Sequence, residues 1–174
     1  MKLKKFFFKK VKSTNNTAMR LIRSGIKNGI ISSEIQTKGK GQRGNNWISR
    51  KGNLFLTIFF QVDKKLSLKK ITNVNLHIIK KIIKNLVKAK IYIKLPNDIL
   101  INKKKVCGIL QEIVFRNNLK FLIVGIGINL INSPDIKNYE TTYLNKYSNK
   151  KINKIQLINK IKFFFENKYK KKNK

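Results

Sequence analysis

The sequence predicts an α+β fold with a mixed, largely antiparallel sheet and helices packed on one side. Segments typical of strands and helices follow one another in the order β-α-β-β-α-β-β-β-β-α. The later strands are short and are separated by tight turns, which favours antiparallel neighbours. The chain has 174 residues, of which 41% are hydrophobic, so it is long enough to form one domain with a hydrophobic core.

The order of elements begins with a strand and a helix. Residues 6–11 are predicted to form the first strand. Residues 13–29 have a helical pattern, with Ser13 or Thr14 as the N-terminal cap and Gly29 as the residue that stops the helix.

Two further strands and a long helix follow. Residues 30–37 are predicted to form a strand that leads into a glycine-rich loop. Residues 53–62 are so strongly apolar that we expect this strand to be covered on both faces. Residues 68–89 have the period of an amphipathic helix, with lysines opposite its apolar stripe. The stripe consists of Ile71, Ile78, Ile79, Ile82, Ile83, Leu86 and Val87.

The second half of the chain contains four short strands and a last helix. The strands are predicted at residues 91–94, 99–102, 106–115 and 119–130. A Pro-Asn-Asp corner, a lysine-rich turn and an Asn-Asn turn join them, and such turns are common between antiparallel strands. Residues 152–169 are predicted to form the last helix. Its inward residues are Ile155, Ile158, Ile161, Phe164 and Phe165.

The formal net charge of +34 raises the question of nucleic-acid binding. Five of the 41 basic residues are arginines, which leaves 36 lysines scattered over every predicted element. A nucleic-acid-binding module would gather its basic residues with interleaved aromatics, and arginine would suit phosphate contacts better. We therefore interpret most of the charge as compositional drift, and keep a basic nucleic-acid-binding module as an alternative.

The compartment is indicated by what the sequence lacks. Cys107 is the only cysteine, so no intrachain disulfide and no cysteine-based zinc site can form. No run approaches the roughly 18 apolar residues of a membrane span. The basic start of the chain has an apolar core too short for a signal peptide. We expect a soluble, cytoplasmic protein without a membrane partner.

One loop, TKGKGQRGNNW at residues 37–47, combines glycines and cations with the only tryptophan. Glycines let a backbone approach a ligand closely, and cations complement an anion. A phosphate loop is excluded because Asn45 and Asn46 stand where Lys and Ser or Thr are needed. A dinucleotide-binding turn is excluded because no helix follows the glycines. The remaining interpretations are an anion-binding loop with a stacking platform at Trp47, and an ordinary glycine-rich connection.

A hairpin at residues 94–113 carries polar groups on both of its strands. Asn97 and Asp98 turn a corner, and Lys105 begins the next strand close to Gly108. Asn and Asp suit Mg²⁺-phosphate contacts or the acceptance of a proton, and a fixed lysine can reach a phosphate. The alternative is ordinary turn chemistry with a solvated lysine-rich tip.

Five motifs follow one another along the chain: STN at residues 13–15, QTKGKGQRGNNW at 36–47, KLPND at 94–98, KKKVCGILQE at 103–112 and VGIGIN at 124–129. Their order and spacing are those of biotin–protein ligases, and nearly the whole chain resembles the catalytic domain of that family. The resemblance implies a fold related to class II aminoacyl-tRNA synthetases. It also implies an enzyme that uses ATP, biotin and Mg²⁺ to form biotinyl-5′-AMP. Such enzymes pass biotin to one lysine of a biotin carboxyl carrier domain, usually of acetyl-CoA carboxylase.

The resemblance also implies roles for individual residues. Lys105 resembles the catalytic lysine that touches the biotin carboxylate and the α-phosphate, and Asp98 is the candidate that helps the acceptor lysine lose a proton. Trp47 matches the adenine-stacking aromatic, and Asn97 the nucleotide and Mg²⁺ contact. The residues implied in biotin binding are Ser13, Thr14, Gln36, Gly39, Lys40 and Lys105. Those implied in ATP binding are Gly41, Gln42, Arg43, Gly44, Trp47, Asn97 and Asn129.

Three positions depart from the family pattern. Gln42 stands where an arginine normally grips the adenylate, so a charge-assisted hydrogen bond is forfeited and we hypothesise that the intermediate is held loosely. Asn45 replaces a common basic residue, and Leu95 replaces the usual tryptophan. The alternatives that stay open are a lipoate or octanoyl ligase of the same fold and a decayed pseudoenzyme.

The ends of the chain lead to expectations about further domains and partners. We expect residues 1–174 to be a single catalytic domain, without an N-terminal DNA-binding winged helix or a C-terminal small β-barrel. We therefore expect no DNA partner. Some members of the family pair through their sheets, so a homodimer is compatible with the resemblance.

Overall fold

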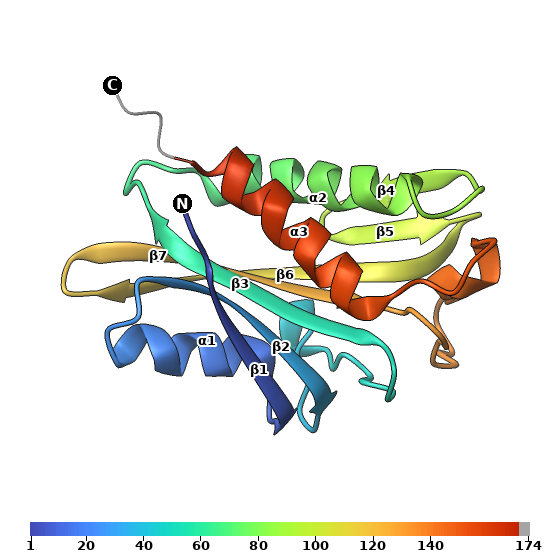
Figure 1. The fold of residues 1–174 in the computed structure, drawn as a ribbon, viewed down its shortest axis with the longest axis horizontal. Helices are drawn as coiled ribbons and strands as arrows, with labels where there is room; N and C mark the ends of the chain where they lie inside the picture. Colours follow the sequence, from blue (N-terminus) through green and yellow to red (C-terminus); the bar gives the residue numbers. More distant parts are fainter. Residues whose placement is uncertain (171–174) are drawn as a thin grey trace.

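The computed structural model describes residues 1–170, whose helices and strands follow the predicted order (Figure 1). The strands are β1 (Lys4–Val11), β2 (Asn28–Gln36), β3 (Leu54–Val62), β4 (Ile91–Lys94), β5 (Asp98–Ile101), β6 (Lys104–Arg116) and β7 (Leu119–Ile128). The helices are α1 (Thr14–Arg23), α2 (Leu68–Lys84) and α3 (Lys154–Lys168), with short 3-10 turns η1 (Gln42–Gly44) and η2 (Leu144–Tyr147). The predicted sequence of elements is confirmed.

The seven strands form one sheet in the order β1-β2-β3-β7-β6-β5-β4. β1 pairs in parallel with β2, because α1 connects them as a crossover, and every other neighbouring pair is antiparallel. The α+β class with a mixed, largely antiparallel sheet is therefore confirmed. The register between β6 and β7 pairs Gly108 with Gly127 and Leu110 with Gly125, which leaves a glycine-lined strip on one face.

The helices cover both faces of the sheet, so the prediction that they pack on one side was wrong (Figure 1). On one face, α2 and α3 share a core with Leu56 and Ile58 of β3. On the other face, Ala18 and Ile22 of α1 pack against Phe59 of the same strand. The physical reason is that β3 is apolar on both sides, as expected from its sequence, so each side must be covered.

The glycine that ends α1 is not the one predicted. α1 ends at Arg23 and not at Gly29. Gly25 has a φ of +102°, a left-handed conformation that commonly ends helices. Gly29 lies instead in β2, where a Cβ would come within 2.8 Å of the rings of Phe6 and Phe59. Gly29 is thus required by packing and not by helix termination.

The later helices also differ in detail from the prediction. α2 ends at Lys84, five residues early. α3 buries Leu157, Ile161 and Phe165, whereas Ile155 is 70% exposed, so its predicted inward position was wrong. The buried residues repeat every fourth position, and a residue two positions from Leu157 lies on the opposite side of a helix.

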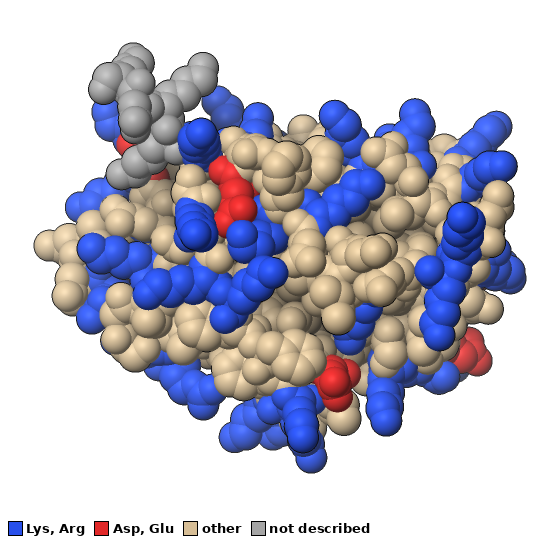
Figure 2. Space-filling view, in the orientation of Figure 1, with Lys and Arg blue, Asp and Glu red and all other residues tan. Residues whose placement is uncertain are grey.

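The surface is strongly basic over a wide area. Lysine and arginine side chains spread over the face shown in Figure 2 and are not gathered there in one patch. This distribution agrees with the scattering of lysines along the sequence. No helix within residues 1–170 is long and apolar enough to cross a membrane.

Candidate active site

A cavity of about 650 Å³ lies on the α1 face of the sheet, beyond the N-terminus of the helix. Its walls come from segments far apart in the sequence: the β1–α1 junction, the end of β2, the loop after β2, the β4–β5 corner and the middle of β6 and β7. Of the residues predicted for the site, the cavity is lined by Ser13, Thr14, Gln36, Lys40, Gly41, Gln42, Arg43, Trp47, Asn97, Asp98 and Lys105. The size is typical of a small-molecule site.

Glycines form the floor of the cavity and allow side chains to lie directly on the sheet. A Cβ at Gly127 would overlap the indole of Trp47, and one at Gly108 would come within 2.8 Å of it. A Cβ at Gly125 would overlap the side-chain amide of Asn15. The alternating glycines therefore have a steric reason: they leave room for one indole and one amide on the same face.

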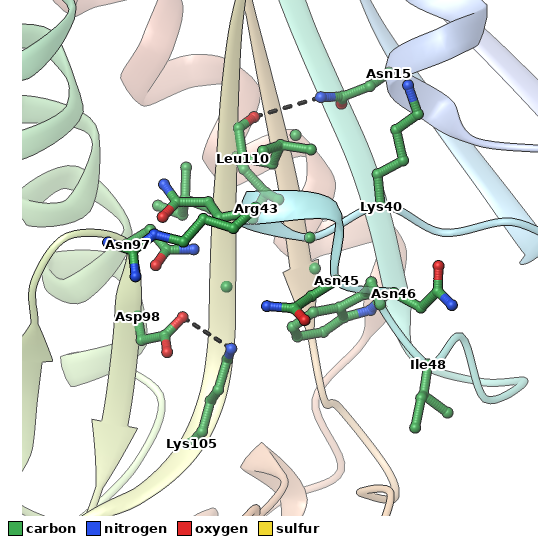
Figure 3. Close-up of a pocket in the computed structure, with 18 of the residues that line it drawn as sticks. Asn15, Lys40, Arg43, Asn45, Asn46, Ile48, Asn97, Asp98, Lys105 and Leu110 are labelled. Atoms are coloured by element: carbon green, nitrogen blue, oxygen red, sulfur yellow. Dashed lines mark hydrogen bonds and ion pairs between the residues drawn. The ribbon is translucent and has the colours of Figure 1, made fainter. Parts of the chain in front are cut away.

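The glycine-rich loop at residues 37–49, which we call the strap, folds back on itself over the cavity. The N–H of Gly41 donates to the carbonyl of Asn45 at 2.7 Å, and the N–H of Trp47 donates to that of Gly39 at 3.0 Å. At its tip, Arg43 has a φ of +54°. Two of its basic side chains point in different directions: Lys40 points toward Asn15, and Arg43 points toward Asn97 (Figure 3).

Lys105 and Asp98 form an ion pair in the wall of the cavity. The Lys105 Nζ lies 2.9 Å from Asp98 Oδ1, with the side chains only 17% and 20% exposed (Figure 3). The same Nζ lies 5.6 Å from the ring centroid of Trp47 and 5.1 Å from that of Tyr139. An ammonium between two aromatic rings and one carboxylate is held at a defined point, where it can meet an incoming anion.

The loop after β7 brings Tyr139 to this lysine. The N–H of Lys105 donates to the carbonyl of Glu140, and the N–H of Thr142 donates to the carbonyl of Lys105, each at 2.9 Å. The hydrogen bond and charge of the Glu140 carboxylate also raise the pKa of the neighbouring Lys104. Sequence reasoning missed Tyr139, because the loop has no glycine pattern or periodicity that would mark it.

A buried polar network lies beneath the end of the cavity nearest α1. The side chain of Gln36 accepts the N–H of Thr14 at 2.8 Å. Thr57 Oγ1 lies 2.8 Å from Thr14 Oγ1 and 2.6 Å from Asn15 Oδ1, and Asn15 Nδ2 donates to Glu112 Oε2 at 2.7 Å. Asn15 and Glu112 lie within two of the five motifs but are not among the predicted site residues. Thr57 lies in an apolar strand, where nothing in the sequence indicates a polar function.

Three predicted site residues do not line the main cavity. Gly39 lies at the base of the strap, where a Cβ would press against the carbonyl of Trp47. Gly44 forms part of the strap's tip and has a φ of +77°. Asn129 is only 2% exposed and donates to the carbonyl of Thr142, in a small adjoining hollow beside the indole. Gly39 and Gly44 thus shape the strap, and Asn129 is bonded to the neighbouring loop.

The described residues offer few ligands for a metal ion and no reactive thiol. Within residues 1–170 there is no cluster of three His, Cys, Asp or Glu side chains that could hold an ion. The side chains of Asn97 and Asp98 carry the oxygen atoms at the cavity corner that could bind a metal ion, and Asp98 is paired with Lys105. Burial raises the pKa of the Cys107 thiol, an effect that Asp98 reinforces, so this cysteine stays protonated.

The chain is similar in sequence to known proteins. The model of the Biotin/lipoate A/B protein ligase family matches residues 7–129. The Bifunctional ligase/repressor BirA of Bacillus spizizenii is 31% identical over 169 residues, which cover 91% of this chain and 51% of that protein. The Biotin--[acetyl-CoA-carboxylase] ligase of Paracoccus denitrificans is 30% identical over 128 residues, covering 71% and 53% respectively.

A solved structure shares the fold as well as part of the sequence. The biotin protein ligase of Leishmania major in complex with biotinyl-5-AMP has a TM-score of 0.76 and 26% identity, with 92% of this chain and 72% of that chain covered. The present chain spans about half the length of the two curated relatives.

Proposed function

The chain belongs to the biotin/lipoate A/B protein ligase family, and on this premise we propose that it is an ATP-dependent biotin–protein ligase. The proposed reaction joins biotin to ATP, giving biotinyl-5′-AMP and pyrophosphate, and then transfers biotin to a lysine of a carrier domain. The observation that carries the proposal is the Lys105 ammonium, which is paired with Asp98 and lies near two aromatic rings in a cavity covered by a cationic strap. We propose the cytoplasm, where ATP is available, as the compartment.

In the first step, the biotin carboxylate attacks the α-phosphorus of ATP and pyrophosphate leaves. Both reactants are negatively charged and charge develops on the leaving pyrophosphate, so catalysis depends on positioning and on cations placed in advance. Lys105 lies in the wall of the cavity, and we propose that its ammonium touches the carboxylate and the α-phosphate together. On the strap, Arg43 points toward Asn97 and Lys40 toward Asn15 (Figure 3), which supports contacts of Arg43 with phosphate oxygens and of Lys40 with biotin.

The two substrates are proposed to occupy opposite ends of the cavity. The polar network at Thr14 and Gln36 offers hydrogen-bonding groups for the biotin head. At the other end, Trp47 offers a ring on which adenine can stack. Trp47 Nε1 and Asn129 Oδ1 are buried with no hydrogen-bond partner within residues 1–170. A nucleotide that formed hydrogen bonds with them would satisfy two polar atoms that are otherwise unpaired.

Magnesium is proposed to arrive with the nucleotide. Mg²⁺ keeps several waters and is commonly held by substrate phosphates with only one or two protein oxygens. The side chain of Asn97 suits that role, whereas the cavity corner has too few oxygen ligands for a complete protein cage. When bound, the ion would neutralise phosphate charge.

In the second step, the amine of the carrier lysine attacks the carbonyl carbon of the adenylate. A C–N bond forms, the C–O bond to phosphate breaks and AMP leaves. The amine must lose a proton, and Asp98 is the carboxylate within the cavity that can accept it. Once phosphate oxygens draw the Lys105 ammonium away, the Asp98 oxygen is released for this purpose. The carrier is proposed to belong to a biotin-dependent carboxylase, such as the acetyl-CoA carboxylase named for the Paracoccus relative.

The experiment that tests the function incubates the protein with ATP, Mg²⁺, biotin and a purified carrier domain. We expect pyrophosphate release that depends on biotin, and a carrier heavier by one biotin in the mass spectrum. Lys105→Ala should abolish both, while Lys103→Asn, an exposed lysine with positive φ at the hairpin tip, should leave both near wild type. Adenylation of lipoate in place of biotin, or of neither acid, would contradict the proposal.

A further inference from the structure

The buried network beneath the cavity contains one proton fewer than its contacts require. Its two ends are fixed hydrogen-bond acceptors. Asn15 Nδ2 faces the Glu112 carboxylate at 2.7 Å and the Leu110 carbonyl at 3.4 Å, so Asn15 Oδ1 must point the other way. At the far end, Gln36 Oε1 accepts the N–H of Thr14, which fixes the orientation of that amide as well.

Two hydroxyl groups lie between these fixed acceptors. The chain of oxygens runs from Asn15 Oδ1 to Thr57 Oγ1 at 2.6 Å, then to Thr14 Oγ1 at 2.8 Å, then to Gln36 Oε1 at 3.0 Å. Each hydroxyl carries one proton, so two protons serve three oxygen–oxygen contacts. If Thr57 donates to Asn15 and Thr14 donates to Thr57, the longest contact, between Thr14 and Gln36, is left without a proton.

We assign the missing proton to the contact between Thr14 and Gln36, because it is the longest of the three and the only one that faces the cavity. Thr14 and Gln36 line the cavity, whereas Thr57 is fully buried behind them. Two oxygens 3.0 Å apart without a proton repel each other, and an N–H group of a ligand placed against them would supply the missing donor. The direction of the network therefore sets the polarity of the ligand group that fits there.

We propose that Glu112 and Thr57 are positioning residues that make Thr14 and Gln36 an acceptor pair for an N–H donor of the substrate's head group. The inference rests on the proposed function and deepens it, because a ureido ring carries two N–H groups whereas a dithiolane ring carries none. Neither Glu112 nor Thr57 lines the cavity, so both act through Asn15 and Thr14. The network thus selects a cyclic urea over a dithiolane acid.

Glu112→Gln tests the direction of the network without changing its size. A glutamine amide can donate to Asn15, which allows the Asn15 amide to turn and donate to Thr57. Thr57 then donates to Thr14, and Thr14 to Gln36, so all three contacts are filled before any ligand arrives. We expect biotin affinity, measured by calorimetry, to fall about tenfold, the usual effect of one lost hydrogen bond. The free protein should melt at the wild-type temperature or above it.

Thr57→Val removes the hydroxyl at nearly constant volume, and Thr57→Ser keeps it as the matched control. In Thr57→Val, the Thr14 hydroxyl has no acceptor other than Gln36 and donates its proton there. The acceptor pair is then already satisfied without a ligand, so biotin affinity should again fall about tenfold. Thr57→Ser should stay within about threefold of wild type, since its hydroxyl can make the same contacts.

A second probe separates positioning from a merely structural role. Biotin methylated on both ureido nitrogens lacks the N–H donors, and its extra bulk is the same for every variant. Wild type should bind it far more weakly than biotin, and Glu112→Gln should reduce that ratio at least severalfold. Equal ratios in both proteins, or unchanged biotin affinity in Glu112→Gln and Thr57→Val, would overturn this inference alone. Failure of wild type to bind biotin would overturn it together with the proposed function.

Discussion

The indole of Trp47 lies so close to Gly127 that a Cβ at position 127 would overlap the ring atoms Cε2 and Cζ2. The indole thus packs the strap directly against the floor of the cavity. Gly127→Ala should displace the indole and weaken ATP binding by about tenfold or more, since stacking contacts of this kind are worth about 1–3 kcal/mol.

Trp47 is the only tryptophan of the chain, so its fluorescence reports this displacement directly. The emission of Gly127→Ala should shift to the red as the indole gains contact with water, and ATP titration should show the weaker binding. An emission maximum and an ATP affinity equal to those of wild type would contradict the docking described.

Asp98→Asn should separate the two proposed half-reactions. Lys105 remains to stabilise the adenylation step, so biotin-dependent pyrophosphate release should stay within about tenfold of wild type. Transfer to the carrier lysine should fall by about 10²–10⁴-fold, the usual range for loss of a general base. Asp135→Asn, an exposed acid in the loop after β7, is the matched control. Equal loss of both half-reactions would argue against a role confined to transfer.

Tyr139→Leu should weaken the hold on the Lys105 ammonium. The ring centroid lies 5.1 Å from Nζ, and such cation–π contacts contribute about 0.5–2 kcal/mol. We expect the KM for ATP to rise about three- to tenfold with little change in melting temperature, because Tyr139 is 40% exposed. Tyr92→Leu, a comparably exposed tyrosine on β4, should leave the KM unchanged. A similar KM in both variants would remove Tyr139 from the site.

The fold was predictable as far as local patterns extend. Short apolar runs with turn residues between them identified the strands, and the apolar stripe of residues 68–84 identified α2. The side of the sheet on which α1 packs was not predictable in the same way. An amphipathic pattern indicates that a helix has a buried face, but it does not indicate which face of the sheet the helix covers. The apolar residues on both sides of β3 nevertheless indicate that both faces of the sheet are covered.

The candidate site was predictable where residue type and motif order coincide, as for Lys105, Asp98 and Trp47. It was not predictable where the position depends on strand register. Thr57 looks like an ordinary β-branched residue of an apolar strand, and only the pairing of β3 with its neighbours places it behind Thr14. Tyr139 depends on the path of a loop with no periodicity. Long-range geometry of this kind has no local signature.

The ionised Glu166 side chain should contribute to the free energy of unfolding at neutral pH and less at acidic pH. Burial by itself would raise the pKa of this carboxyl, but the Lys162 ammonium and the N–H of Leu3, each at 2.6 Å, hold it below its usual range. A carboxyl whose pKa is lower in the folded state stabilises the fold above its unfolded pKa, about 4.3, and loses that contribution as the pH falls through the folded value.

Glu166→Gln should therefore cost about 1 kcal/mol of unfolding free energy at pH 7, the scale of a charge-assisted contact near the surface. The difference from wild type should shrink as the pH falls below about 4. Urea unfolding at several pH values measures both effects, with Glu34→Gln as an exposed control on β2. A difference independent of pH would show that charge is not its cause.

Gln42→Arg should change how long the adenylate stays in the cavity. Gln42 lines the cavity from the η1 turn of the strap, next to Arg43, whose side chain points toward Asn97 (Figure 3). An arginine at position 42 adds a charge-assisted hydrogen bond to phosphate, worth about 1.5–3 kcal/mol, so release of biotinyl-5′-AMP should slow by about ten- to a hundredfold. Gln42→Met has a similar size without the charge and should not slow release. Trapping the free adenylate with hydroxylamine measures the rate, and equal rates for wild type and Gln42→Arg would mean that Arg43 already supplies the charge that the strap needs.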